Sequence, residues 1–188
     1  MSPKKNVGTD LGLTRDEKAQ LQRIARSVVE AKSSGKPLPY ISASSPKLEE
    51  RCGAFVSLYK KGMLRGCIGS LQADGPLYKT VEEMAQAAAS RDPRFRPVTE
   101  DELPYLDIEI SVLTPLRQIR NPEEVRVGIH GLMIRKGFLS GLLLPQVAAE
   151  RNWDRPTFLR ETCRKAGLPP DAWMDDDAEL YVFSADVF

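Results

Sequence analysis

Apolar positions near the N-terminus recur with the period of an α-helix. They are Leu21, Ile24, Ala25, Val28 and Val29. Because Thr14 and Glu17 form the pattern of a capping box, we predict that this helix begins at Thr14 and ends at Ser33-Ser34-Gly35. Residues 1–12 are expected to be a disordered tail. The segment 36–49 contains three prolines and predicts a long irregular connection.

The period changes to two after Gly53. Residues 54–59 are rich in β-formers, Lys60-Lys61-Gly62 supplies a turn, and residues 63–68 are predicted to return as the second strand of a hairpin. A helix is expected to begin at Asp74-Gly75-Pro76 and to end near Ser90, because Asp92 precedes a proline. Residues 106–112 alternate between apolar and polar side chains, which predicts a strand with one core face and one solvated face.

A short repeat relates the two halves of the chain. Lys61-Gly62-Met63-Leu64-Arg65-Gly66 matches Lys136-Gly137-Phe138-Leu139-Ser140-Gly141 in its lysine, glycines and leucine. Each copy follows a β-rich segment and precedes helical sequence and a strand, which is 106–112 in the first half and 180–187 in the second. The pattern predicts duplication of a unit made of a hairpin, helices and a strand within one sheet.

The second half contains a helix with clear ends. Asp154 is expected to cap it, and Gly167 before Leu168-Pro169-Pro170 is a typical stop signal. Cys163 shares the apolar face of this helix and is predicted to lie in the core. Trp153 and Trp173 are expected to anchor the packing around it.

Composition narrows the classes of function. Among 188 residues, 41% are hydrophobic, and 27 lysines and arginines face 26 aspartates and glutamates, for a net charge of +1. A near-neutral chain disfavours nucleic-acid binding, although the cluster Arg91, Arg94 and Arg96 keeps that class open. We expect a cytosolic protein, since no apolar run reaches the length of a membrane span and the N-terminus lacks the apolar core of a signal peptide.

Cysteine and histidine usage argues against metal chemistry. Three cysteines without an export signal predict free thiols rather than disulfides. One histidine and no Cys-x-x-Cys pair leave almost no ligand set for zinc. We therefore expect neither a metal nor a cofactor.

The strongest candidate site is Leu64-Arg65-Gly66-Cys67-Ile68-Gly69. On a regular strand Arg65 and Cys67 would share a face, and a guanidinium beside a thiol favours the nucleophilic thiolate. Gly66 and Gly69 would let a ligand approach the backbone closely. The second copy has Ser140 and Leu142 where the first has Arg65 and Cys67, so the first copy looks specialised. The alternative is that Cys67 is a small buried hydrophobe on a tight hairpin.

Proton-transfer partners for Cys67 are also present. If the polar face of strand 106–112 meets the cysteine, Glu109 and Asp107 become candidates for a general base or for positioning groups. His130, between two glycines, can transfer protons near neutral pH, and a Cys67–His130 dyad is a second possibility. The alternatives are a solvated strand face and a turn histidine with a backbone hydrogen bond.

Several segments together resemble one known family. They are Leu64-Arg65-Gly66-Cys67-Ile68-Gly69, Arg91-Asp92-Pro93-Arg94-Phe95, Asp107-Ile108-Glu109-Ile110-Ser111-Val112-Leu113, His130-Gly131-Leu132, Ser140-Gly141-Leu142-Leu143-Leu144-Pro145-Gln146-Val147-Ala148 and Thr162-Cys163 with Lys165-Ala166-Gly167-Leu168-Pro169. The chain is thereby similar to the AMMECR-type domain family, whose prokaryotic members are named AmmeMemoRadiSam system protein A. Many relatives have Thr-Phe where this chain has Ser70-Leu71.

The resemblance implies an α+β fold in which two related β-rich repeats form one barrel-like, mainly antiparallel sheet with flanking helices. It implies a single domain over residues 13–188, with repeats at about 13–114 and 115–188. It also implies a setting beside a Memo-like protein and a radical S-adenosylmethionine enzyme. It implies no particular reaction.

Two functions remain open from the sequence. In the first, the protein is an enzyme or enzyme component that holds a small or protein-borne substrate near Arg65, Gly66, Gly69, Arg94 and Asp107. Cys67 would then be the nucleophile or attachment point, and His130 or Glu109 its proton-transfer partner. In the second, the protein is a non-catalytic adaptor that docks those partners through residues 64–69.

Overall fold

The structure is a computed structural model that describes residues 8–71 and 74–188. Contacts within the chain divide it into two compact units. The N-terminal unit comprises Leu11–Leu113 with Val187–Phe188, and the C-terminal unit comprises Thr114–Asp186 with the described residues before Leu11. The division falls beside the expected boundary between the repeats, and a single domain over residues 13–188 stays a prediction.

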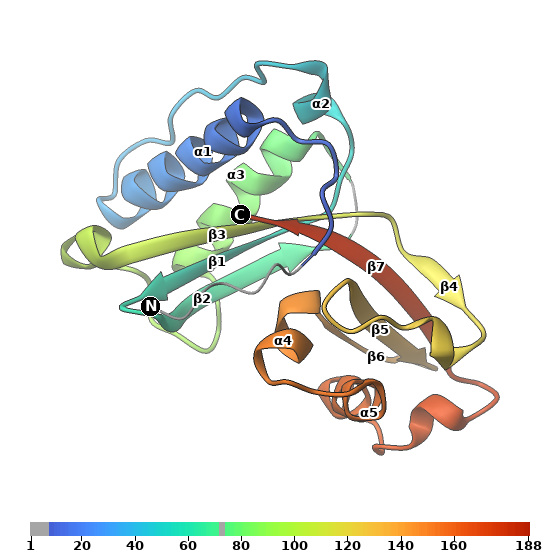
Figure 1. The fold of residues 1–188 in the computed structure, drawn as a ribbon. Coiled ribbons are helices and arrows are strands. Elements are labelled where there is room, and N and C mark those ends of the chain that lie inside the picture. Colours follow the sequence, from blue (N-terminus) through green and yellow to red (C-terminus); the bar gives the residue numbers. More distant parts are fainter. Residues whose placement is uncertain (1–7, 72–73) are drawn as a thin grey trace. The chain divides into compact units, whose positions relative to one another are not determined.

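The N-terminal unit is a sheet covered by two helices. Its strands are β1 (Ala54–Lys60), β2 (Met63–Ser70) and β3 (Leu106–Leu113), which pair antiparallel in the order β2-β1-β3. The long helices α1 (Arg15–Ser33) and α3 (Leu77–Ser90) lie on the same side of these strands (Figure 1). The short helix α2 (Pro46–Glu49) interrupts the expected irregular connection, and a 3-10 helix, η1 (Glu100–Tyr105), precedes β3.

The local signals in the sequence explain the ends of these elements. Thr14 and Glu17 form the predicted capping box of α1, and the whole predicted apolar stripe of that helix is buried. Lys61 and Gly62 have φ values of 51° and 79°, which is the pair of positive angles that a two-residue type I′ hairpin turn requires. These predictions are confirmed.

The polar face of β3 is less exposed to solvent than the sequence predicted. The sequence predicted a solvated polar face, but Ser111 on β3 and Ser57 on β1 are both buried. Asp107 is exposed, and Glu109 lies between these extremes. The polar face of this sheet is therefore enclosed along most of its length, which brings its side chains within reach of one another.

The C-terminal unit repeats the plan of a hairpin, helices and a strand. Its strands pair antiparallel in the order β4-β7-β5-β6. Their bounds are Arg117–Ile119 for β4, His130–Lys136 for β5, Leu139–Leu143 for β6 and Glu179–Val187 for β7. The helices are α4 (Pro145–Glu150) and α5 (Arg155–Lys165), with the 3-10 helices η2 (Pro122–Glu124) and η3 (Ala172–Met174). The fold is thus α+β, with antiparallel strands and flanking helices, as predicted.

The core of the C-terminal unit forms around α5. Asp154 accepts a hydrogen bond from the Thr157 backbone N–H and caps the helix as expected. Cys163 is fully buried, and Trp153 and Trp173 pack against the same cluster. The predictions for these residues are confirmed.

Residues 8 and 9 belong to the expected disordered tail but are held by backbone hydrogen bonds. Gly8 N donates to Gly128 O at 2.9 Å, and Thr9 N donates to Ala185 O at 2.8 Å. Residues 1–7 of that tail lie outside the described residues. Within the described chain, no helix is both long and apolar enough to cross a bilayer.

Candidate functional site

A β-bulge at Arg65 separates the two residues that the sequence placed together. Leu58 pairs with Gly66, whereas the next residue of β1, Tyr59, pairs with Leu64, so Arg65 is an extra residue on β2. The regular alternation of side chains is lost at such a bulge. The assumption of a regular strand, on which Arg65 and Cys67 would share a face, is therefore wrong at this point.

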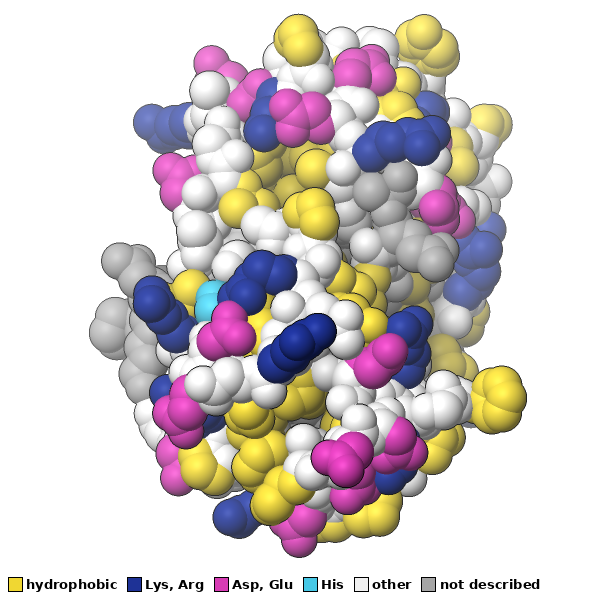
Figure 2. Space-filling view, turned by 90° about the vertical axis from the view of Figure 1, so that its right-hand side faces the viewer, with side chains coloured by type: hydrophobic (Ala, Val, Ile, Leu, Met, Phe, Trp, Pro, Cys, Tyr) yellow, Lys and Arg dark blue, Asp and Glu magenta, His cyan; other side chains and the backbone are white. Residues whose placement is uncertain are grey.

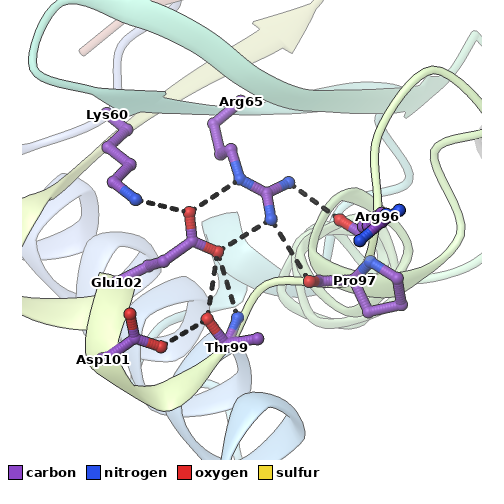
Figure 3. A network of polar contacts seen from close by, with 7 residues as sticks. All are labelled: Lys60, Arg65, Arg96, Pro97, Thr99, Asp101 and Glu102. Atoms are coloured by element: carbon purple, nitrogen blue, oxygen red, sulfur yellow. Dashed lines mark hydrogen bonds and ion pairs between the residues drawn. The ribbon is translucent and has the colours of Figure 1, made fainter.

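Arg65 is held in a network of polar contacts (Figure 3). Its Nε and Nη2 donate to the two carboxylate oxygens of Glu102 at 3.0 and 2.8 Å. Nη1 also donates to Arg96 O at 2.9 Å, and Nη2 to Pro97 O at 3.2 Å. Because its three nitrogens all donate within the protein, Arg65 fixes the loop after α3 instead of presenting a free anion site.

Glu102 is the centre of this network. Besides Arg65, it accepts from Lys60 Nζ at 2.8 Å and from the Thr99 backbone N–H at 3.2 Å (Figure 3). Hydrogen bonds from Arg65, followed by those from Lys60, hold the pKa of this carboxyl well below its usual range. Sequence reasoning missed Glu102, although the pattern from Thr99 to Glu102 is a capping box and was a local signal.

The backbone of Cys67 is held by the loop that follows α3. The buried carboxylate of Asp92 accepts from Cys67 N at 2.8 Å, and Arg94 Nη2 donates to Cys67 O at 3.2 Å. β2 is the end strand of its sheet in the N-terminal unit, so these two side chains occupy backbone groups that a further strand would otherwise pair with. Arg94, predicted to bind substrate, here closes a sheet edge.

Asp92 and Arg94 also form a forked ion pair. Arg94 Nε and Nη2 donate to the Asp92 carboxylate at 2.9 and 2.7 Å. Hydrogen bonds from Arg94 lower the pKa of Asp92 to about 2, against the opposing effect of burial. The carboxylate is therefore charged at neutral pH.

The thiol of Cys67 lies in a row of polar side chains across three strands. Ser57 on β1 pairs with Cys67 on β2 and with Glu109 on β3. Ser57 Oγ donates to Cys67 Sγ at 3.2 Å. Of the predicted partners, the structure therefore places Glu109 in the same row as Cys67, with Ser57 between them, and leaves Asp107 on the exposed part of β3.

The surroundings of Cys67 do not activate its thiol. Burial raises the pKa of Cys67 above its ordinary value, and the carboxylates of Asp92 and Glu109 act in the same direction. The hydrogen bond from Ser57 and the charge of Arg94 lower the pKa but do not outweigh burial. A thiol with a raised pKa is mostly protonated at neutral pH, so it is a poor nucleophile.

His130 lies in the other compact unit, at the start of β5. Its Nδ1 accepts from the Arg126 backbone N–H at 3.3 Å, as expected for a turn histidine. Burial, followed by the charges of Arg117 and Arg126, lowers the pKa of His130, so the ring is neutral at pH 7. The structure thus gives His130 a local role in its turn.

The glycines of the motif are explained by packing within the protein. A Cβ on Gly66 would lie 2.4 Å from Ala88 O of α3, and a Cβ on Gly69 would lie 2.1 Å from the ring of Phe55. The second repeat uses the same device, because a Cβ on Gly141 would lie 2.4 Å from Ala166 N. Gly66 and Gly141 therefore let a helix approach its strand, which explains a glycine at each position.

The hairpin of the first repeat is one residue longer than that of the second, because of the extra residue at Arg65. In the C-terminal unit, β5 and β6 pair without a bulge around the turn 137–138, so Gly141 follows the turn sooner than Gly66 follows the turn 61–62. Matching Gly66 with Gly141 places Leu142, Met133 and Tyr181 where the N-terminal unit has Cys67, Ser57 and Glu109. The bulge and the polar row are thus features of the first repeat.

The described residues contain no cluster of side chains that could bind a metal ion. Over residues 8–71 and 74–188, no three side chains among His, Cys, Asp and Glu come together as metal ligands would. All three cysteines are free thiols, with Cys163 buried and Cys52 and Cys67 partly buried.

Comparison with known proteins identifies the family. A family model described as AMMECR1 matches residues 22–188. A protein of Methanothermobacter thermautotrophicus is 44% identical over 183 residues, which cover 94% of this chain and 95% of that protein. The crystal structure of the uncharacterized protein PH0010 from Pyrococcus horikoshii matches with a TM-score of 0.83 and 42% identity, covering 89% of this chain and 88% of that one. The chain therefore belongs to the AMMECR1 family.

Proposed function

We propose that the N-terminal unit is a protein-docking module whose contact surface is the tip of the β1–β2 hairpin. One observation carries the proposal. The contacts of four charged side chains hold β2 in place: Arg65, Glu102, Asp92 and Arg94. The residues just before Arg65 are turned to solvent. Met63 is 72% exposed and Leu64 39% exposed, so this rigid hairpin presents two neighbouring apolar side chains to solvent.

The hairpin tip has the properties of an interface anchor. The type I′ turn and the network around Glu102 fix its backbone, so little conformational entropy is lost when a partner binds. Tyr105 is 54% exposed and lies under Lys61, whose Nζ is 5.2 Å from the centre of its ring. Methionine and tyrosine are enriched at protein interfaces. Lys61, Met63, Leu64 and Tyr105 are called the hairpin-tip surface below.

The family resemblance names the partners to test. A Memo-like protein and a radical S-adenosylmethionine enzyme are the partners that we propose, with the cytoplasm as the compartment. Free thiols at all three cysteines fit a reducing compartment of this kind. In this proposal the protein positions one partner for the other and performs no covalent step itself.

The test compares two exposed apolar residues on the two hairpins. Leu64→Asp is expected to weaken retention of a partner by about tenfold or more, because it places a charge in the centre of the contact. Phe138→Asp is the matched control, since Phe138 is fully exposed at the tip of the β5–β6 hairpin. Retention would be measured by co-purification from cells that express the tagged protein with each candidate partner.

Three results bear directly on the proposal. Cys67→Ser should keep the partner bound, because the proposal gives the thiol no reaction to perform. Loss of binding in Phe138→Asp alone would assign docking to the other hairpin. Partner binding that survives Leu64→Asp unchanged would contradict the proposal.

A second function is favoured by the row of Cys67, Ser57 and Glu109. In it, the Cys67 sulfur adds to an electrophilic carbon of a small or protein-borne substrate, where a π bond opens as the new bond forms. The Ser57 hydroxyl, 3.2 Å from the sulfur, turns to take up the thiol proton, and Glu109 on the paired strand is the general base that finally holds it. It requires the thiol to react readily near neutral pH. The raised pKa of Cys67 makes this the less supported of the two functions.

A further inference from the structure

The loop Arg91–Pro97 carries positive charge along the edge of β2. Arg94 reaches Cys67 O, while Arg65 of β2 reaches the carbonyl oxygens of Arg96 and Pro97. The loop is therefore tied to the strand at two places. It begins at the end of α3 and leads into η1, next to the hairpin-tip surface.

Two of the three arginines in this loop have no ion pair among the described residues. The charge of Arg94 is balanced by Asp92. Arg91 and Arg96 are exposed, and neither side chain has an acidic partner in the part of the chain that the structure describes. They are therefore available to an acidic group from outside.

The loop that carries these arginines is tied to β2 next to an exposed apolar side chain. Arg65 Nη1 donates to Arg96 O at 2.9 Å, and Arg65 directly follows Leu64 on β2. Phe95, between the arginines in sequence, has the guanidinium carbons of Arg94 and Arg65 at 5.4 and 6.0 Å from its ring centre. The loop 91–97, with Arg91 and Arg96 exposed, is called the cationic strip below, and it is tied to β2 at Arg65, the residue after Leu64 of the hairpin-tip surface.

We propose that the partner docks through an acidic segment with an apolar anchor. The carboxylates lie against Arg91 and Arg96, and the anchor contacts Met63 and Leu64. Charge complementarity of this kind accelerates association and selects partners. The inference rests on the docking function proposed above and adds the chemical class of the bound segment.

The alternative ligand, a nucleic acid, fits this surface less well. Exposed carboxylates of Glu100, Asp101 and Asp107 follow the loop, so the positive charge ends there and cannot follow the many phosphates of a nucleic-acid strand, whereas a short acidic segment needs only the loop itself. The whole chain has a net charge of +1. Figure 2 draws a different face, the right-hand side of Figure 1, and there too basic and acidic side chains are interspersed.

The experiment uses two labelled peptides and one oligonucleotide with the full-length protein. The first peptide is composed of glutamate, leucine and glycine, and the second has every glutamate replaced by glutamine. Binding is measured by fluorescence anisotropy at low salt and at about 0.15 M salt, where charges beyond about 8 Å are screened. The variants are Arg91→Gln with Arg96→Gln, and Arg23→Gln as a control for an exposed arginine on α1.

The acidic peptide is expected to bind more tightly than the glutamine peptide and to weaken as salt rises. The Arg91→Gln, Arg96→Gln variant should lose about fivefold in affinity for it, as two exposed ion pairs would. Arg23→Gln should bind as the unaltered protein does.

The remaining outcomes overturn the inference in different ways. If both peptides bind equally and binding still depends on Leu64, docking through the hairpin stands and the acidic class is wrong. If neither peptide binds and no partner depends on Leu64, both proposals are wrong. If the oligonucleotide binds and loses affinity in the Arg91→Gln, Arg96→Gln variant while the acidic peptide does not bind, the strip recognises nucleic acid.

Discussion

Replacement of Glu102 by alanine is expected to lower the free energy of unfolding by about 3 kcal/mol. The side chains of Arg65 and Glu102 are only 16% and 11% exposed, so removing the carboxylate leaves a largely buried guanidinium without its partner. Lys60 loses the same partner. Urea unfolding followed by circular dichroism would measure the change.

An exposed ion pair in the other repeat provides the control. Arg135 and Glu179 are 50% and 40% exposed, and Glu179→Ala should cost less than about 1 kcal/mol. Equal losses in the two variants would show that the network around Glu102 contributes no more than a surface pair, and the rigid hairpin would lose its main support.

Acid should remove the same stabilisation. The folded-state pKa values of Glu102 and Asp92 lie below their unfolded values, so the unfolded chain binds more protons in acid. The contribution is complete above about pH 5 and is lost as the pH falls towards 2. The Glu102→Ala variant should therefore lose stability less steeply than the unaltered protein over that range.

Alanine at Gly66 is expected to destabilise the protein by about 2–3 kcal/mol. The added Cβ would meet the backbone oxygen of Ala88 at 2.4 Å, and a helix backbone cannot give way as a flexible side chain would. α3 would have to move away from β2, which would open the core between them. Thermal unfolding followed by circular dichroism would detect the loss.

Gly75→Ala is the matched control for this substitution. Gly75 lies just before α3, and a Cβ there would have no atom within 4 Å. Its replacement should change the free energy of unfolding by no more than about 0.5 kcal/mol. A Gly66→Ala variant as stable as the Gly75→Ala variant would contradict the packing role and favour close approach of a ligand.

Periodicity and caps predicted most of the elements, because those signals are local. The helix that begins after Thr14, the hairpin around Lys61-Gly62 and the helix capped by Asp154 all form where the sequence placed them. The short helix α2 and strand β4 have weak patterns and were not predicted. Whether such short segments form a helix or a strand depends on contacts with other parts of the fold.

The candidate site was predicted less well, because one bulge changes its register. Counting from the turn at residues 61–62 without a bulge would set Ser57 opposite Gly66. The extra residue at Arg65 shifts the pairing, so that Ser57 meets Cys67 instead. Gly66 is a general sign of a bulge in a strand, but the contacts that hold Arg65 come from Glu102 and the loop before η1, which lie far along the chain.

The role of residues 64–69 in function stays a prediction, while the structure shows what their side chains contact. Arg65 was expected to bind an anionic group of a substrate, and in the structure it binds the carboxylate of Glu102. Asp92 and Arg94 were noticed as part of a family segment, but their contacts to the Cys67 backbone depend on how the loop after α3 returns to β2. The path of this loop is set by tertiary packing, and the periodicity of the sequence carries no information about it.

The central claim is that the β1–β2 hairpin is a rigid element that docks a partner through its tip, and that the Cys67 thiol on it is not activated. The most direct test is the rate at which iodoacetamide labels each cysteine as the pH is varied, with adducts located by mass spectrometry. We predict that Cys67 in the folded protein is labelled slowly, with an apparent pKa above that of an ordinary cysteine, because burial raises it. Rapid labelling of Cys67 at neutral pH, with an apparent pKa well below that value, would contradict the claim and make thiol chemistry the leading function.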